Sequence, residues 1–267
     1  ILEGLNGIET IVFNRNIYQN NYFVTYQKKD RENLLNMLAQ DRRIIVGPLY
    51  TFENYLELAQ ISNQYNNLKI VVASNSAKKT LLELSNFEID ESQLVTLPTG
   101  VDFKKNILKN KENLSNNNKK CLIYFKGRSI QDLDVVTKSL NSEQTQYRIF
   151  KYGKYKNSNL INYAKNVDFA IILGRTESQG IAINKFMSMN IPLFVLDSTI
   201  NNYDGRKFEG TSVPYWSEDC GMKITNIDNF QDLFKKFKYN LEKNYYSPYK
   251  LASTKLSYEV MHQNLLN

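Results

Sequence analysis

The sequence predicts an α/β protein in which helices cover both faces of a parallel sheet. Short runs of β-branched and aromatic residues alternate with helical patterns along most of the chain. Strands that alternate with helices of about three turns favour this arrangement. One run, VDFAIILG, is apolar throughout, which is typical of a strand buried on both faces. A polar, basic segment near the middle of the chain then predicts a division into two domains.

The first third of the chain contains the elements of the first predicted domain. Predicted strands cover residues 8–13, 22–26, 43–48 and 69–74, followed by a shorter one in QLVTLPTGVD that ends in a Pro-Thr-Gly turn. TFENYLELAQISNQY has apolar residues at helical spacing, so it predicts a helix. A second helix follows the fourth strand, with Ser74 or Ser76 as its cap.

Residues 104–120, KKNILKNKENLSNNNKK, are strongly polar and basic. We interpret them as an interdomain linker. The alternative is a solvated surface loop inside a single domain.

The second half is more regular. The predicted strands are CLIYF, YRIFKYG, VDFAIILG and IPLFVLD, and the helices between them are IQDLDVVTKSL, SNLINYAKN and SQGIAINKFMSMN. A less regular segment containing SVPYWSEDCGMKI follows. Two amphipathic helices, at about residues 227–244 and 247–265, complete the chain.

Composition limits the chemistry. The net charge of +7 and the pI of about 9.1 favour anionic partners, although surplus lysines on solvated faces explain the same numbers. No apolar run approaches the ~20 residues that span a bilayer, and the N-terminal residues lack the features of a secretory signal. We therefore expect a cytoplasmic protein. Cys121 and Cys220 form no disulfide framework, and His262 is the only histidine, which removes most Ser-His, Cys-His and His-metal chemistry.

Two turns follow predicted strands of the second half, where ligands of open α/β sheets bind. Lys126, Gly127 and Arg128 follow CLIYF, and a guanidinium can hold a phosphate by two hydrogen bonds. Residues 175–180 follow VDFAIILG and open a helix whose free N–H groups and dipole attract anions. Glu177 can accept hydrogen bonds from hydroxyl groups. Together these features describe a nucleotide-sugar site.

The segment ESQGIAINKFMSMNIPLFVLD resembles the donor-site segment of GT-B glycosyltransferases, especially the retaining family called GT4. Four other segments resemble that family in the same order along the chain: LNGIET, IVVASNSAKKTLLELSNFEIDESQLVTLPTGVD, IYFKGR and SVPYWSEDCG. The resemblance implies two Rossmann-like domains facing a cleft, with a reduced N-terminal domain and a C-terminal helix that crosses back. We expect the domains at residues 1–107 and 108–246, with residues 247–267 as the returning helix.

The resemblance also implies roles for individual residues. Arg128 and Glu177 are the predicted catalytic residues, and Asn6 and Gly7 line the acceptor or phosphate side. The predicted donor-binding residues are Lys126, Gly127, Ser178, Gln179, Gly180, Ile181 and Lys185. Lys185 replaces a second acidic residue of the family, and Gln131 and Asp132 stand where a basic residue is usual.

The predicted function is transfer of a sugar from a nucleotide-sugar donor, such as a UDP- or GDP-sugar, to an acceptor hydroxyl. If the chain follows the family it resembles, transfer retains the anomeric configuration and needs no metal or cofactor. The expected acceptor is a glycan, a lipid-linked molecule or a protein, and peripheral association with an anionic membrane surface is a further expectation. One alternative is an inactive module that binds a nucleotide, a sugar or a partner protein. A DNA glucosyltransferase ranks lower, because no DNA-binding motif is readable and nucleic acid is not an expected partner.

Overall fold

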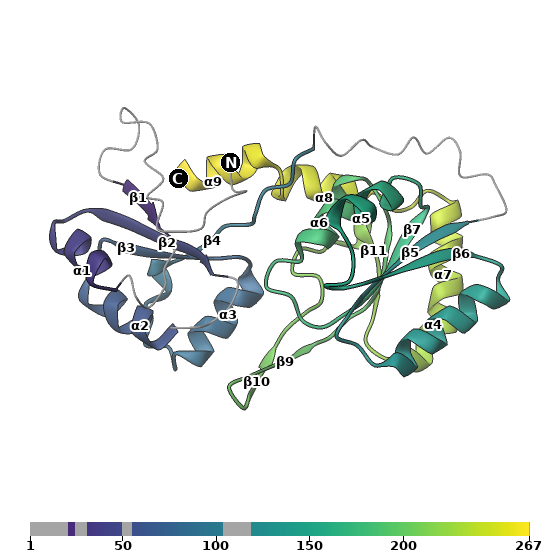
Figure 1. The fold of residues 1–267 in the computed structure, drawn as a ribbon, viewed down its shortest axis with the longest axis horizontal. Coiled ribbons are helices and arrows are strands. Elements are labelled where there is room, and N and C mark those ends of the chain that lie inside the picture. Colours follow the sequence, from purple (N-terminus) through teal and green to yellow (C-terminus); the bar gives the residue numbers. More distant parts are fainter. Residues whose placement is uncertain (1–20, 25–30, 50–54, 104–118, 267) are drawn as a thin grey trace. The chain divides into compact units, whose positions relative to one another are not determined.

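A computed structural model describes residues 21–24, 31–49, 55–103 and 119–266. The chain divides into two compact units, Ile1–Pro98 (unit 1) and Thr99–Asn267 (unit 2), which are coloured along the chain in Figure 1. The domain boundary predicted at 107/108 lies outside the described residues. The predicted packing of residues 247–267 against the N-terminal domain remains a prediction. Both units are α/β with parallel sheets, as the sequence predicts.

Unit 1 contains a four-stranded sheet in the order β1-β2-β3-β4, in which each pairing is parallel. Its elements are β1 (Asn21–Val24), α1 (Arg31–Ala39), β2 (Arg43–Leu49), α2 (Tyr55–Gln64), β3 (Leu68–Val72), α3 (Asn75–Leu84) and β4 (Leu94–Thr96). Ser74 caps α3, because its hydroxyl oxygen accepts a hydrogen bond from the Ala77 N–H at 3.1 Å. The strand predicted at residues 8–13 lies outside the described part of the chain.

Unit 2 contains a five-stranded parallel sheet in the order β11-β8-β7-β5-β6. The strands are β5 (Lys120–Lys126), β6 (Gln146–Lys151), β7 (Phe169–Gly174), β8 (Leu193–Leu196) and β11 (Gly221–Ile224). Every residue of β7 is buried. The uninterrupted apolar run of its sequence fits a central strand with helices on both sides.

The two faces of this sheet carry separate hydrophobic clusters. On one face, α4 (Ile130–Ser142) and α7 (Phe230–Glu242) pack on alternate residues of β5 and β7. On the other face lie α5 (Asn157–Ala164), α6 (Ile181–Ser188) and α8 (Pro248–Lys255), an arrangement visible in Figure 1. Burial of apolar area on both faces stabilises unit 2.

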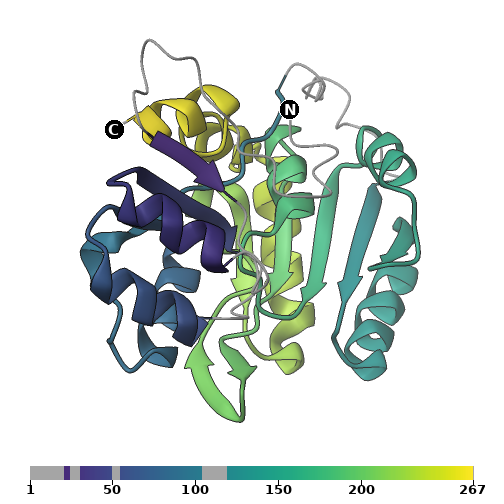
Figure 2. The ribbon, with the colours of Figure 1, turned by 60° about the vertical axis from the view of Figure 1, so that its left-hand side comes forward.

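The segment after β8 contains strands that the sequence analysis did not predict. β9 (Ile200–Tyr203) and β10 (Arg206–Glu209) form an antiparallel hairpin, and β11 lies within the segment predicted to be irregular. Asp204 and Gly205 connect the hairpin with positive φ angles of 51° and 70°, which an Asp-Gly pair tolerates well. In Figure 2 the hairpin extends beyond the end of the sheet toward which the strand arrows of unit 2 point.

The helix predicted at 247–265 is wrong in its extent, because the structure has two helices there, α8 and α9 (Tyr258–Leu266). The break follows from contacts that are distant in sequence. The Leu256 carbonyl accepts a hydrogen bond from the Val101 N–H at 2.7 Å, and the Ser257 hydroxyl caps the new helix at the Val260 N–H. Short 3₁₀ turns lie at Glu91–Gln93, Glu218–Cys220 and Ile227–Asn229. None of the described helices is both long and apolar enough to cross a membrane.

Candidate functional site

The strand order of unit 2 marks where a ligand would bind. β5 lies between β6 and β7, so the chain first adds a strand on one side of β5 and then continues on the other side. Open parallel sheets bind ligands beyond the carboxyl ends of their strands, at this reversal. Here the reversal lies between β5 and β7. The residues that follow these two strands are the two turns that the sequence singled out.

Lys126 and Glu177 meet at this edge. Lys126 ends β5 and Glu177 follows β7, and the Lys126 Nζ lies 2.7 and 2.8 Å from the two carboxylate oxygens. The Glu177 side chain is 11% exposed. On its other side the ammonium faces the Tyr152 ring, 4.3 Å from the centroid. The two charges therefore neutralise each other inside a largely enclosed pocket of side chains.

Two further tyrosines lie close to this ion pair. Burial raises the pKa of Tyr124 well above its usual value, and a hydrogen bond with Tyr155 and the negative charge of Glu177 raise it further. Burial likewise raises the pKa of Tyr155, and the Glu177 charge adds to that effect. The rings of Tyr124 and Tyr155 meet edge to face, with centroids 6.4 Å apart. Both phenols therefore stay protonated near neutral pH.

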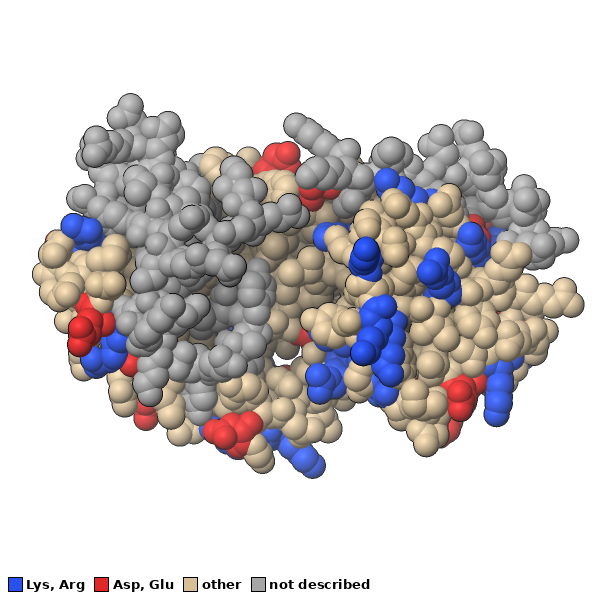
Figure 3. Space-filling view, viewed as in Figure 1, with Lys and Arg blue, Asp and Glu red and all other residues tan. Residues whose placement is uncertain are grey.

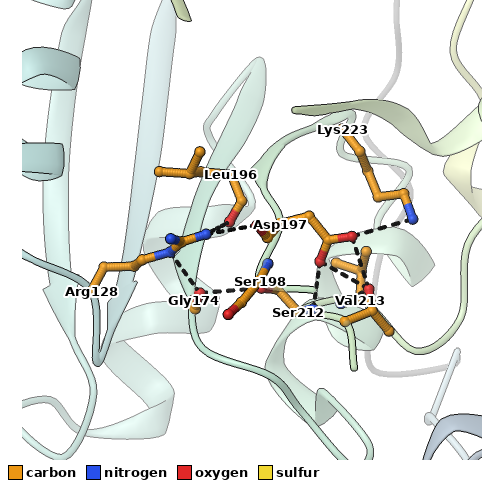
Figure 4. A network of polar contacts seen from close by, with 9 residues as sticks. Arg128, Gly174, Leu196, Asp197, Ser198, Ser212, Val213 and Lys223 are labelled. Atoms are coloured by element: carbon orange, nitrogen blue, oxygen red, sulfur yellow. Dashed lines mark hydrogen bonds and ion pairs between the residues drawn. The ribbon is translucent and has the colours of Figure 1, made fainter. Parts of the chain in front are cut away.

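Arg128 lies at the same edge of the sheet as Glu177, but its guanidinium is directed at the main chain. Its Nε donates to the Gly174 carbonyl at 3.0 Å, and its Nη2 donates to the Leu196 and Asp197 carbonyls at 2.8 Å each. Figure 4 shows these contacts. Nη1 lies 4.0 Å from the carboxylate of Asp132. Arg128 thus joins the carboxyl ends of β7 and β8.

A buried carboxylate continues this network. Asp197 is 6% exposed, and its oxygens accept hydrogen bonds from the Ser212 N–H at 2.6 Å and the Thr211 hydroxyl at 2.9 Å. Lys223 lies 3.4 Å away, also visible in Figure 4. The Ser212 hydroxyl donates to the same Gly174 carbonyl that Arg128 contacts, at 3.1 Å. The sequence analysis missed this group, although Asp197 ends the quoted run IPLFVLD.

The start of α6 is shaped by Gly180. Gly180 has φ 68° and ψ 45°, a left-handed conformation that glycine adopts without strain, and no side chain caps the helix. The helix is followed inward from this point by buried residues, and Ile181 itself is 42% exposed. Ser178 is half-buried. The first N–H groups of α6 therefore lie beside Glu177, where an anion would be favoured.

Gln179 is turned inward. Its side chain belongs to a residue that is 2% exposed, and among the described residues neither its amide nitrogen nor its amide oxygen has a hydrogen-bond partner. Its main-chain carbonyl accepts a hydrogen bond from the Asn184 side chain at 3.3 Å. The residue predicted to bind the donor therefore contributes main-chain groups at the surface and a buried side chain.

The other predicted residues are spread more widely. Gly127 has φ 69° and lies directly under the side chain of Arg175. Lys185 lies in the last turn of α6 and is half-buried. Asn6 and Gly7 lie outside the described residues. Of the predicted set, the structure brings together Lys126, Glu177 and the residues that open α6, with Gly127 and Arg128 beside them.

Basic side chains are prominent around this site. The loop after β6 contains the exposed lysines Lys151, Lys154 and Lys156, and Arg175 is exposed as well. Figure 3 shows Lys and Arg side chains gathered on the face of unit 2 turned toward the viewer, with few acidic ones between them. Within the described ranges, no group of three or more His, Cys, Asp or Glu residues is arranged to hold a metal ion.

No protein-family model matches this sequence, and no curated protein does either. Solved structures are similar to it. A glycosyltransferase from Rickettsia africae ESF-5 aligns with a TM-score of 0.60 and 15% identity, covering 92% of this chain and 75% of that one. TarM aligns with a TM-score of 0.62 and 12% identity, covering 92% of this chain and 54% of TarM. WaaB, a lipopolysaccharide outer core galactosyltransferase, aligns with a TM-score of 0.56 and 12% identity, covering 91% and 73% of the two chains.

These proteins are GT-B glycosyltransferases, so the chain has the two-domain, Rossmann-like fold that the sequence predicts. The chain spans about half the length of TarM. At these identities the similarity establishes the fold and leaves the activity to be argued from the site.

Proposed function

We propose that this protein is a glycosyltransferase that transfers a sugar from a nucleotide-sugar donor to an acceptor hydroxyl. One observation carries the proposal. At the strand reversal of unit 2, the enclosed carboxylate of Glu177 stands beside the uncapped start of α6, with cationic side chains on both sides. A carboxylate accepts hydrogen bonds from sugar hydroxyls, while amide groups and cations hold a diphosphate. The GT-B fold supports the same assignment by analogy.

The donor would lie across this edge with its diphosphate at the start of α6. The first turn of α6 contains no acidic residue that would repel the phosphates. Its N–H groups have no intrahelical partners, and the helix dipole adds a positive potential there. Glu177 would accept hydrogen bonds from the hydroxyls of the attached sugar, once Lys126 shares or releases the carboxylate oxygens.

The reaction needs charge stabilisation at the leaving group. The bond between the anomeric carbon and the diphosphate oxygen breaks, and a bond from that carbon to the acceptor oxygen forms. The departing phosphate oxygen gains negative charge and takes the proton of the acceptor hydroxyl. Preorganised donors and cations aimed at such charge supply a large share of catalysis. This proposal needs no histidine base, which fits a chain whose only histidine is His262.

Retention of configuration and independence from metals belong to the proposal as well, on the resemblance to the GT4 family. TarM, a structural relative, has been crystallised with UDP and α-GlcNAc-glycerol. A UDP- or GDP-sugar remains our prediction for the donor here. The acceptor class, a cytoplasmic location and association with an anionic membrane surface remain predictions from the sequence.

A non-catalytic nucleotide- or sugar-binding module is the second candidate. Two observations favour it: Lys185 stands where the family has a second acidic residue, and Lys126 already occupies both oxygens of Glu177. Such a module would bind the donor without consuming it.

A thermal-shift screen against a panel of nucleotide sugars tests the proposal. A ligand that binds only the folded state at about 100 times its Kd stabilises that state by about 2.7 kcal/mol. We expect at least one nucleotide sugar to raise Tm in the wild type. Glu177→Gln should weaken the response to the sugar-bearing ligand by about 10- to 100-fold in affinity, because it removes a charged acceptor.

Glu242→Gln is the matched control, since Glu242 is an exposed carboxylate on α7. It should leave the Tm response unchanged. Donor hydrolysis or transfer in a coupled assay would exclude the binding module. If no nucleotide sugar raises Tm at millimolar concentration, the glycosyltransferase proposal is wrong.

A further inference from the structure

Arg175 is the residue at this edge that the sequence analysis passed over. It directly follows β7, and its N–H donates to the Lys126 carbonyl at 2.9 Å, which extends the pairing of β5 with β7 by one step. Its main chain therefore lies at the strand reversal itself, two residues before Glu177. Its side chain is exposed.

Gly127 fixes where the Arg175 side chain lies. A Cβ atom at Gly127 would be 2.5 Å from the Arg175 Nε, 2.6 Å from its Cδ and 2.7 Å from its Cγ. The stem of Arg175 thus lies flat on the Gly127 main chain, in space that any other residue would fill. An arginine held in this way loses less side-chain freedom on binding a ligand than one that moves freely.

The charge of Arg175 is also available. Among the described residues its guanidinium has no ion pair, and the nearest acidic residue in sequence, Glu177, is bound by Lys126 at 2.7 Å. Arg128 differs in this respect. Its Nε and Nη2 donate to the carbonyls of Gly174, Leu196 and Asp197, and its side chain is 20% exposed.

A diphosphate that displaced Arg128 from these carbonyls would leave the ends of β7 and β8 without their hydrogen bonds. Unpaired carbonyls in an enclosed place are costly. A two-pronged contact between Arg128 and a phosphate would therefore work against the fold, whereas the same contact from Arg175 breaks no hydrogen bond that the structure shows.

We propose that Arg175 supplies the guanidinium that contacts the donor's diphosphate, and that Arg128 is a positioning residue that holds the ends of β7 and β8. This inference rests on the proposed function. It deepens that proposal by naming the cation of the phosphate subsite, and it reassigns the role that the sequence gave to Arg128.

Isothermal titration calorimetry of the full chain tests the inference, with UDP, GDP, ADP and inorganic pyrophosphate as titrants. Arg175→Ala should weaken the best-binding nucleoside diphosphate and pyrophosphate by about 10- to 100-fold, because a charge-assisted contact is lost. Arg175→Lys keeps the charge but loses the forked geometry, so it should fall between the two. Lys138→Ala removes an equal charge from an exposed position on α4 and should bind like the wild type.

Arg128 is tested by stability as well as binding. Arg128→Ala should lower the urea midpoint of unit 2, followed by the fluorescence of Trp216, the only tryptophan. Arg128→Lys serves where the alanine variant does not fold. Because the positioning role acts on the fold, the folded Arg128→Lys protein should keep diphosphate affinity within about 3-fold of the wild type, below the loss that a charged contact represents.

Gly127→Ala gives an independent test. The added methyl group should displace the Arg175 stem and weaken diphosphate binding, and it should have no further effect in the Arg175→Ala background. If Arg175→Ala binds diphosphates as the wild type does, the inference is overturned while the proposed function stands. If folded Arg128→Lys loses binding and Arg175→Ala keeps it, Arg128 has the phosphate role. If the wild type binds none of the titrants, the proposed function fails and this inference fails with it.

Discussion

Lys126 and Glu177 are 51 positions apart in the sequence and meet because β5 and β7 are neighbours. Each residue alone has an ordinary explanation, a lysine at a strand end and an acid ahead of a helix. Their contact at 2.7 Å in a largely enclosed place gives the pair a meaning that neither has alone. An ion pair of this kind stabilises only when both partners are present, because one partner left alone is an uncompensated charge.

Lys126→Met should therefore lower the free energy of unfolding by about 1–3 kcal/mol. The substitution keeps the length of the side chain and removes the charge that faces Glu177. Urea denaturation followed by Trp216 fluorescence measures the change. Combined with Glu177→Gln in a double-mutant cycle, the two substitutions should cost less together than the sum of their separate effects.

The exposed pair Lys235 and Asp232 is the control for this cycle. Their side chains are 64% and 94% exposed and lie 3.9 Å apart, so Lys235→Met should change stability by less than about 1 kcal/mol. Strict additivity of Lys126→Met and Glu177→Gln would show that the pair contributes nothing.

At the scale of single elements, α7 shows how a local pattern becomes a packed face. Phe230, Phe234, Phe237 and Leu241 are buried and recur at helical spacing. Phe234 meets Phe169 of β7 and Phe194 of β8, with ring centroids 5.7 and 5.3 Å apart. The amphipathic pattern predicted this helix from the sequence. The strands that the pattern would meet were not predictable from it.

Phe234→Ala should destabilise unit 2 by about 3–5 kcal/mol, because it removes a fully buried ring and leaves a cavity between α7 and the sheet. Tyr239→Ala on the same helix should stay within about 0.5 kcal/mol, since Tyr239 is 61% exposed. The urea midpoint checks both variants. Equal losses at the two positions would contradict the packing described for α7.

Among the elements, the sequence predicted most strands and helices of the described residues in the right order. Their signals are local: alternation of apolar residues, helical spacing and capping residues such as Ser74. It missed β9, β10 and β11, which are short and carry weak patterns. It also joined α8 to α9, because the hydrogen bond between Val101 and Leu256 that separates them has no local signature.

At the scale of the whole molecule, the chain contains 18 tyrosines, and several in unit 2 are enclosed. Burial raises the pKa of Tyr124 and of Tyr215 well above the usual tyrosine value, and it raises the pKa of Tyr163 and Tyr246 in the same direction. A raised pKa in the folded state means that the folded chain holds these protons after the unfolded chain has lost them.

Stability should therefore be lost as the pH rises. Below about pH 10, these phenols are protonated in both states and contribute nothing to pH dependence. Above that value the unfolded chain ionises first, so the free energy of unfolding falls with increasing pH. Urea denaturation at pH 8, 9, 10 and 11 measures the slope.

Tyr215→Phe should flatten this slope relative to the wild type, whereas Tyr245→Phe should not, because Tyr245 is 62% exposed. Each variant is compared with its own stability at pH 8, which corrects for lost packing. Identical slopes in the wild type and Tyr215→Phe would contradict a folded-state origin for the alkaline effect.

The sequence by itself determined the α/β class, the division into two parts, and the two turns at strand ends where the candidate site lies. Hydrophobic periodicity and turn residues encode these features locally, so they can be read without knowing what each segment contacts. Only the tertiary structure decided that β5 and β7 are neighbours, that Lys126 closes on Glu177, and that Arg128 is bound to the carbonyls of Gly174, Leu196 and Asp197 while Arg175 lies exposed over Gly127. These facts depend on strand order, which brings distant residues together, and no local pattern of side chains specifies it.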